Sequence, residues 1–164
     1  MLRIRIAFLI DHPEAIPTLT RWFQAQWPAY YAARTPADIA RDFLAEAHRE
    51  GLPVRLLAFA DGEVAGTITL RDQALSSIPG YHPGLGGLLV VEQHRGRGIG
   101  TELVRAGMQL ARQQGYERVY ATTITARGIL ERLGWKLIEV VSHNSEQLLM
   151  FCCELTDHQG RPGS

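Results

Sequence analysis

The sequence predicts one mixed α/β domain with a largely antiparallel sheet of about seven strands and helices on both faces. Its 164 residues match the usual size of a single domain. A hydrophobic fraction of 46% with 21% charged residues can build a buried core. Segments of strand periodicity alternate with segments of helical periodicity. We therefore expect one domain over residues 1–155 and a polar, frayed tail over 156–164.

The first quarter of the chain predicts one strand and two helices. Residues 2–10 alternate apolar and polar side chains, the pattern of a half-buried strand. Apolar side chains then recur every three or four residues over 13–28 and again over 35–51, which predicts two amphipathic helices. Thr35 suits the cap of the second helix and Pro36 its first position.

A hairpin and a buried strand follow. The β-rich runs 54–60 and 63–70 flank an Asp-Gly pair, which favours a two-residue turn between antiparallel strands. Residues 71–84 are rich in Pro and Gly and predict a loop. The next run, 85–91, is almost wholly apolar, as expected for a strand in the middle of a covered sheet.

The last third of the chain continues the alternation of helices and strands. We expect a helix from the glycine-rich residues 96–100 to Gly115, a strand over 118–124, a short helix over 126–133, and strands over 135–141 and 147–155. The strands at 85–91 and 118–124 are joined through a helix and should form the parallel pair.

Charge and hydropathy exclude several classes of partner. Seventeen basic residues balance seventeen acidic ones, so no net charge draws the chain to nucleic acid or to an anionic membrane. No apolar run approaches the ~20 residues of a membrane span, and the first residues alternate in charge where a signal peptide would be apolar. We expect a cytoplasmic protein with no nucleic-acid or membrane partner.

The cysteines and histidines predict neither a disulfide nor a metal site. The two cysteines, Cys152 and Cys153, are neighbours, and neighbours in a strand point to opposite faces. The six histidines are scattered without the spacing of zinc ligands. We therefore expect no bound metal.

The informative stretch is LLVVEQHRGRGIGT at residues 88–101, where a buried strand passes through a glycine loop into a helix. The first turn of a helix leaves N–H groups unpaired, and glycines let a phosphate oxygen approach the backbone. Arg95 and Arg97 add positive charge. The pattern predicts an anion cradle. The alternative is a tight turn with solvated arginines.

Two common phosphate motifs do not match this loop. A Walker loop ends in Gly-Lys-Ser/Thr, whereas the only lysine of this chain is Lys136. A dinucleotide fingerprint needs G-x-G-x-x-G, whereas the spacing here is Gly96-x-Gly98-x-Gly100. Neither ATP hydrolysis nor NAD binding is favoured.

The sequence instead resembles the GNAT superfamily of N-acetyltransferases. The signature Q/R-x-x-G-x-G/A occurs twice in overlapping register, from Gln93 to Gly98 and from Arg95 to Gly100. Leu133-Gly134-Trp135 resembles the Leu-Gly-Phe turn of the family. The predicted order of strands and helices is also that of the family, so the resemblance covers nearly the whole chain.

The resemblance implies a site for acetyl-CoA as co-substrate. Strands 85–91 and 118–124 would splay apart to admit the pantetheine arm, which would bind the backbone of Leu89, Val90 and Val91. The pyrophosphate would lie on the amides at the start of the following helix. That set is Arg95, Gly96, Arg97, Gly98, Ile99, Gly100 and Thr101.

The resemblance also implies direct attack of an amine on the thioester in a ternary complex. Val90 is the candidate oxyanion donor through its backbone N–H. Some relatives carry a carboxylate base near the start of the fourth strand, but residues 83–87 contain no acid. His82 and Asp72 are the candidate proton acceptors nearby, with ordinary loop residues as the alternative.

The acid that protonates the departing thiolate in many relatives is missing. Leu130 stands where the family places that tyrosine. Thr123, Thr125 or a water could assist the thiolate instead, and Tyr120 is expected to be a packing residue. The departure leaves a second hypothesis open, a non-catalytic acyl-CoA-binding or sensing domain. A nucleotide-binding oxidoreductase is the third.

Acceptor contacts in the family come from the first two helices and from loops beside the central strands. Here the candidate residues are Trp27, Tyr30, Tyr31, Asp72 and Tyr81, with Trp22, Arg34, His82, His143 and Asn144 as further members. Few of them are acidic, which does not favour a polycation. A small amine, an amino acid and a peptide N-terminus stay open as acceptors, and so does a homodimer.

Overall fold

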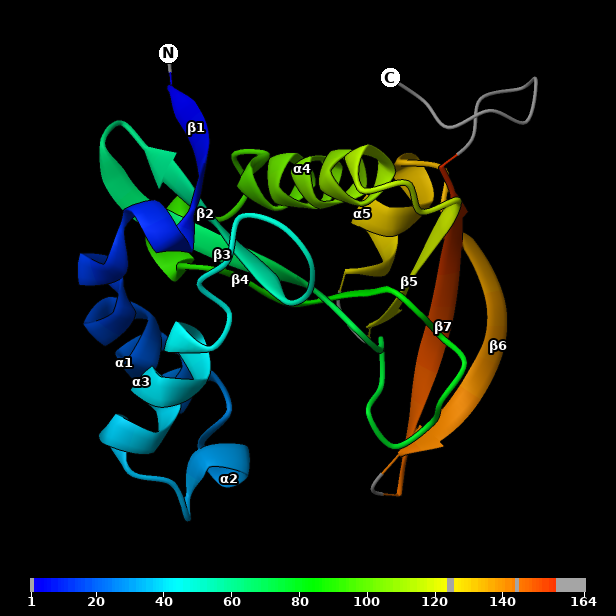
Figure 1. The fold of residues 1–164 in the computed structure, drawn as a ribbon, viewed down its shortest axis with the longest axis horizontal. Coiled ribbons are helices and arrows are strands. Elements are labelled where there is room, and N and C mark those ends of the chain that lie inside the picture. The colour runs from blue at the N-terminus through cyan, green and yellow to red at the C-terminus, as the bar shows by residue number, and fades with distance from the viewer. Residues whose placement is uncertain (1, 124–125, 144, 156–164) are drawn as a thin grey trace.

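A seven-stranded sheet organises the chain, with the strand order β1-β2-β3-β4-β5-β7-β6 (Figure 1). The computed structural model describes residues 2–123, 126–143 and 145–155. The strands are β1 Ile4–Phe8, β2 Val54–Ala60, β3 Glu63–Arg71, β4 Gly84–Val90, β5 Arg118–Thr123, β6 Lys136–His143 and β7 Glu146–Glu154. All neighbours are antiparallel except β4 and β5. The predicted fold class is confirmed, and the predicted tail over 156–164 lies outside the described residues.

Helices cover both faces of the sheet. They are α1 Ile16–Gln26, α2 Pro28–Tyr31, α3 Pro36–Leu44, α4 Ile99–Gln113 and α5 Arg127–Arg132, with short 3₁₀ turns at Leu9–Asp11, Pro13–Ala15 and Glu92–His94. In Figure 1, α1, α2 and α3 lie below β1–β4 while α4 and α5 lie on the opposite side. We call the side of α1–α3 the front face and the side of α4 the back face.

Each face has its own apolar core. Leu57, Phe59 and Leu89 contact the buried residues of α1 and α3 on the front face. Alternating residues of the same strands, such as Leu56 and Leu85, contact the buried residues of α4 on the back face. The two cores explain why the middle strands are apolar at nearly every position.

The second predicted helix is shorter than its pattern suggested. A capping box between Thr35 and Asp38 starts α3 as expected, but the helix ends at Leu44 rather than near Gly51. The chain turns at Glu46, whose carbonyl accepts the N–H groups of His48 and Arg55. The prediction was wrong there because the Glu46 carbonyl accepts the N–H of Arg55 on β2 and that of His48, instead of continuing the hydrogen bonds of the helix. The helical turn α2, which begins at a proline after α1, was not predicted.

The predicted hairpin turn at Asp61 and Gly62 and the predicted loop between β3 and β4 are both confirmed. Asp61 and Gly62 both have positive φ, 49° and 89°, as the two-residue turn between β2 and β3 requires. The loop after β3 packs on β6 and β7, where Ala74 and Leu75 form one apolar cluster with Val141 and Met150. The front face thus carries helices at one end and this loop at the other.

Strands β4 and β5 separate after a single pair of residues. Gly84 and Tyr120 are the only partners that β4 and β5 share among the described residues. On its other side β4 pairs with β3, with a bulge opposite the step from Thr67 to Thr69. Gly87 lies in that bulge and has φ +60°. The predicted splaying of these two strands is confirmed.

Candidate active site

The glycine loop after β4 presents the start of α4 as the sequence predicts. Gly98 caps the helix with φ 85°, and no side-chain cap hydrogen bond is made there within the described part of the chain. Gly96 also has positive φ, 78°, a conformation that L side chains rarely adopt. Nothing lies within 4 Å of a Cβ built on either glycine. The amides of Ile99, Gly100 and Thr101 are therefore open to an anion.

A cleft of about 890 Å³ runs from this loop through the gap between β4 and β5. Its walls come from β4, the glycine loop, α4, β5 and α5, and from Gln26 and Trp27 at the end of α1. Among the predicted cofactor residues, Leu89, Val90, Arg95, Gly96, Gly98, Ile99, Gly100 and Thr101 line it. Val91 and Arg97 do not belong to the lining. The volume lies within the usual range for ligand sites.

The backbone of Val90 faces the open gap. Val91 donates its N–H to the carbonyl of Ala65 on β3, at 2.9 Å. Because successive amides of a strand point to opposite edges, the N–H and C=O of Val90 point toward β5. No described residue of β5 pairs with Val90. This strand edge can therefore bind an extended ligand arm.

Arg95 does not extend over the glycine loop. Its Nε donates to the Val90 carbonyl at 2.8 Å, and its Nη2 donates to Oε1 of Gln26 at 3.3 Å. The guanidinium thus joins α1 to the end of β4. Arg97, by contrast, is exposed beside the cradle. The charge at the mouth of the cleft is present as predicted, but one of the two arginines points along the strand edge.

Close packing fixes α4 against the cleft. A Cβ on Gly107 would lie 2.5 Å from Cδ1 of Leu85, and one on Gly100 would lie 3.0 Å from Cδ1 of Ile129. Both glycines let the helix approach β4 and α5 closely. The amides of the first turn are held in place by this packing.

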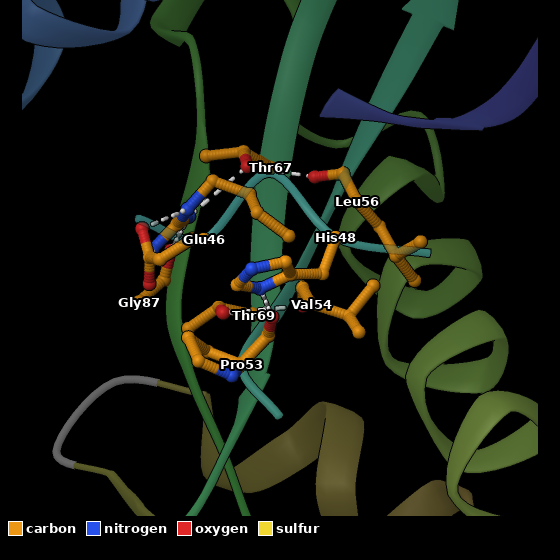
Figure 2. A network of polar contacts seen from close by, with 9 residues as sticks. Glu46, His48, Pro53, Val54, Leu56, Thr67, Thr69 and Gly87 are labelled. Carbon is orange, nitrogen blue, oxygen red and sulfur yellow. Dashed lines mark hydrogen bonds and ion pairs between the residues drawn. The ribbon is translucent and has the colours of Figure 1, made fainter. Parts of the chain in front are cut away.

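A buried ion pair stands on the front face beside the bulge (Figure 2). Arg55 donates from Nε and Nη2 to the two carboxylate oxygens of Glu46, at 2.8 and 3.2 Å. Its Nη1 donates to Oγ1 of Thr67 at 3.0 Å, and that hydroxyl donates to the Leu56 carbonyl at 2.7 Å. The guanidinium also lies over the ring of Phe43, 5.0 Å from its centroid. This network clamps the chain after α3 onto the sheet.

The two predicted proton acceptors contact one another outside the cleft lining. Nδ1 of His82 lies 2.9 Å from Oδ1 of Asp72 and 2.7 Å from the carbonyl of Asp72. The ring of His82 packs edge-on against Tyr116. Both side chains are exposed, at the start of β4. The pair therefore lies at the end of the strand away from the glycine loop.

The predicted acceptor contacts divide between two places. Trp27 lines the cleft, and Tyr31 is half-buried against Phe23 nearby. Tyr30 is 72% exposed on α2. Tyr81, which belongs to the loop after β3, packs edge-on against Tyr120 of β5. Of the further candidates, Trp22 packs against the front core and Arg34 pairs with Asp42, while Oγ of Ser77 lies 2.9 Å from Nδ1 of His143.

Leu130 on α5 is one of the apolar residues that line the cleft. It is buried, at the position where the resemblance in sequence would have placed a tyrosine. Thr123 also lines it, and its Oγ1 accepts the N–H of Ala126 at 2.7 Å. Ile124, Thr125 and Asn144, which the sequence also brought forward, lie outside the described residues. Cys153 is buried on the back face, and burial raises the pKa of its thiol to about 11.

Sequence reasoning missed several residues around the site. Gln26, Gly86, His94 and Arg132 line the cleft. The Arg55 ion pair was also missed, although an arginine in the otherwise apolar run VRLLAFA is a signal of a buried charge with a partner. The remaining residues carry no such signal.

Neither a metal site nor a membrane span is found in the described part of the chain. No group of three or more His, Cys, Asp or Glu residues there could hold a metal ion. No helix there has the length and apolar character to cross a lipid bilayer.

Known proteins share this sequence pattern and this fold. A family model described as acetyltransferase (GNAT) family matches residues 16–135. Human N-acetyltransferase 8B is 33% identical over an alignment 148 residues long, and the alignment covers 80% of this chain and 59% of that protein. The chain thus spans less than two thirds of the length of this relative.

Solved structures of acetyltransferases superpose on nearly the whole chain. An aminoglycoside 6'-N-acetyltransferase complexed with coenzyme A gives a TM-score of 0.73 at 16% identity, covering 92% of this chain and 96% of that one. A ribosomal L7/L12 alpha-N-protein acetyltransferase in complex with coenzyme A gives 0.66 at 18% identity, covering 93% of each chain. At these identities the likeness concerns the fold.

Proposed function

The chain belongs to the acetyltransferase (GNAT) family, and from that premise we propose that it transfers the acetyl group of acetyl-CoA to a primary amine. The acceptor class covers small molecules, amino acids and peptide N-termini. The amine attacks the thioester directly while both substrates are bound. The observation that carries the proposal is the continuity of the amide cradle with the gap between β4 and β5.

The proposed site for acetyl-CoA uses the two backbone features of the cleft. The diphosphate lies on the amides from Arg95 to Thr101, where the helix start supplies N–H donors and a positive dipole end. The pantetheine arm lies along Leu89, Val90 and Val91 as an added strand. This placement requires Arg95 to release the Val90 carbonyl, because a ligand amide would compete for the same oxygen.

The proposed reaction places the thioester beside the bulge. The amine nitrogen forms a bond to the thioester carbon, and the carbonyl oxygen becomes an oxyanion. The N–H of Val90, which points into the gap, is the donor that stabilises it. Positioning of the two reactants supplies much of the acceleration. The C–S bond then breaks and coenzyme A leaves as a thiolate.

The proposed proton acceptor is the pair His82 and Asp72, reached through water. No described residue that lines the cleft is a carboxylate. The histidine of the lining, His94, has Nε2 4.0 Å from Glu63, beside the glycine loop. His82 instead has one ring nitrogen held by Asp72, which leaves the other able to take a proton.

The proposed route for the thiolate needs no tyrosine. A thiol has an ordinary pKa near 8.5, so the thiolate is a fair leaving group near neutral pH. The hydroxyl of Thr123 accepts one hydrogen bond and keeps its own proton to donate to the sulfur.

Free-thiol release in the presence of acetyl-CoA and a panel of amines tests this function. We expect release that depends on the acceptor and yields the N-acetylated amine. The apolar residue Leu130 favours one other candidate, an acyl-CoA-binding or sensing domain. Tight acetyl-CoA binding without turnover for any amine would support that domain and overturn the enzyme.

A further inference from the structure

A second arginine lies on the front face next to Arg55. Arg71 is the last residue of β3 and Arg55 belongs to β2, and both project from the front face, like Thr67 and Thr69 between them. The two guanidinium groups lie against the glycines of the β4 bulge. A Cβ on Gly86 would lie 2.4 Å from Nη2 of Arg71, and one on Gly87 would lie 3.0 Å from Nη2 of Arg55.

Only one of these two charges is neutralised. Arg55 is bonded to both oxygens of Glu46 and to Thr67. Arg71 donates from Nη2 to the Ala74 carbonyl at 3.1 Å, which supplies no negative charge. Its Nε is buried without a hydrogen-bond partner among the described residues. No carboxylate of the described chain lies within ion-pair distance of Arg71.

The surroundings of Arg71 disfavour its charged form. Burial lowers the pKa of Arg71, and the charge of Arg55 lowers it further, while Glu46 and the tyrosines of α2 raise it. Arg71 therefore lies in a poorly solvated place beside a second positive charge, Arg55, which is the one bonded to Glu46. A buried charge of this kind is costly unless an anion pairs with it.

The unpaired guanidinium lies where an acceptor would approach the thioester. Gly86 and Gly87 line the cleft at the point where β4 leaves β5, and the guanidinium of Arg71 packs directly on Gly86. Trp27 lines the same cleft from the end of α1. Arg71 does not itself line the cleft; it is a partly exposed residue of the front face whose guanidinium packs on Gly86, which does line it.

We propose that Arg71 binds a carboxylate of the acceptor, so that the preferred substrate is an amine that carries a carboxylate close to its amino group, as a free α-amino acid does. The proposal rests on the acetyltransferase function above. A planar guanidinium edge suits a carboxylate, with which it forms two parallel charge-assisted hydrogen bonds. The same charge repels a polycationic acceptor. A carboxylate that Arg71 holds beside Gly86 places the neighbouring amine next to the thioester.

Matched acceptors test the proposal. Each of several α-amino acids is compared with its α-carboxamide and its decarboxylated amine, which keep the nucleophile and remove the negative charge. The readout is kcat/KM from thiol release. We expect the carboxylate to raise kcat/KM by roughly 10- to 100-fold, the effect of a hydrogen bond to a charged group.

Variants of Arg71 separate recognition from folding. Arg71→Gln should remove the advantage of the acid over its amide, lowering kcat/KM for the acid far more than for the decarboxylated amine. Arg71→Lys should restore part of the advantage, because the charge returns without the planar edge. Arg21→Gln on α1 is the control and should keep the full preference. Coenzyme A affinity, measured by calorimetry, should stay unchanged in all three variants.

Two failures are distinguishable. If amines are acetylated with equal kcat/KM whether or not they carry a carboxylate, or if Arg71→Gln lowers both alike, the carboxylate site is wrong and the acetyltransferase function stands. If no acceptor releases thiol, the function itself is overturned together with the site that rests on it.

Discussion

Gly84 and Tyr120 join the two central strands at one end, with the Tyr120 N–H donating to the Pro83 carbonyl at 3.0 Å. Beyond this pair the described parts of β4 and β5 share no partners. The backbone of Ala74 packs closely on Gly84 at this point. A Cβ on Gly84 would lie 2.3 Å from both Cα and N of Ala74. The cleft thus opens directly beyond Gly84, a glycine that lets the loop at Ala74 pack against the start of β4.

Gly84→Ala should therefore destabilise the protein by about 1–3 kcal/mol, since the new methyl meets backbone that cannot rotate away. The measurement is equilibrium unfolding in urea. Gly128→Ala in α5 is the control, because its Cβ would meet only the flexible end of Arg132, at 3.2 Å. The control should gain up to about 1 kcal/mol from helix propensity. Equal stability of Gly84→Ala and the unchanged protein would contradict the packing argument.

Thr101→Asp should weaken coenzyme A binding at least about tenfold without loss of stability. Thr101 is in the first turn of α4, where a carboxylate stabilises the helix yet repels a bound diphosphate. Calorimetric titration measures the affinity, and the loss should shrink as salt is added. Thr101→Asn is the uncharged control and should bind nearly as well as the unchanged protein. Unaltered affinity of the aspartate variant would remove the diphosphate from this helix.

Glu46→Gln should cost about 3 kcal/mol of unfolding free energy. The change leaves the buried Arg55 without its only carboxylate partner among the described residues, and breaking one side of a buried pair is strongly destabilising. Asp42→Asn is the control, because the pair between Asp42 and Arg34 is exposed and should contribute less than about 1 kcal/mol. If both variants lost the same small amount, Arg55 would not depend on Glu46.

His82→Gln should lower kcat about tenfold or more with little change in KM for acetyl-CoA, if the pair with Asp72 accepts the proton. His48→Gln is the control, since its Nδ1 binds the Pro53 carbonyl away from the cleft. Kinetics like those of the control would make His82 an ordinary loop residue.

Stability should fall at high pH because of Cys153. Burial raises the pKa of this thiol to about 11, above the value of roughly 8.5–9 expected once the chain unfolds. The thiol therefore contributes its full stability below about pH 9 and loses it as the pH rises through about 11. Urea midpoints at pH 8 and pH 10.5 measure the effect, and Cys153→Ala should show a smaller drop. An equal drop in both proteins would assign the loss to other groups.

Patterns among residues close in sequence predicted most of the fold. The periods of two and 3.6, the Asp-Gly turn and the cap at Thr35 each depend on neighbours in sequence, and the structure confirms them. The end of α3 was misjudged because Ala45 and Ala47 keep a helical pattern while Glu46 is drawn to Arg55 on β2. Tertiary pairing decided that boundary, and no local pattern reveals it.

The candidate site also combines features that are local in sequence with features that are not. The residues of the amide cradle are contiguous in sequence, so they could be proposed together. The pairing of Arg55 with Glu46 and the unpaired Arg71 beside Gly86 join different elements across the sheet. A single sequence gives no register between strands that are far apart, so those relationships needed coordinates.

Amide chemical shifts recorded during titration test the central claim most directly. Adenosine 3′-phosphate 5′-diphosphate carries the charged end of coenzyme A without the pantetheine arm. We expect it to shift the amides of Gly98, Ile99, Gly100 and Thr101 only, and whole coenzyme A to shift those of Val90 and Val91 as well. Shifts confined to other parts of the chain, or a Val90 amide unmoved by the whole cofactor, would contradict the account.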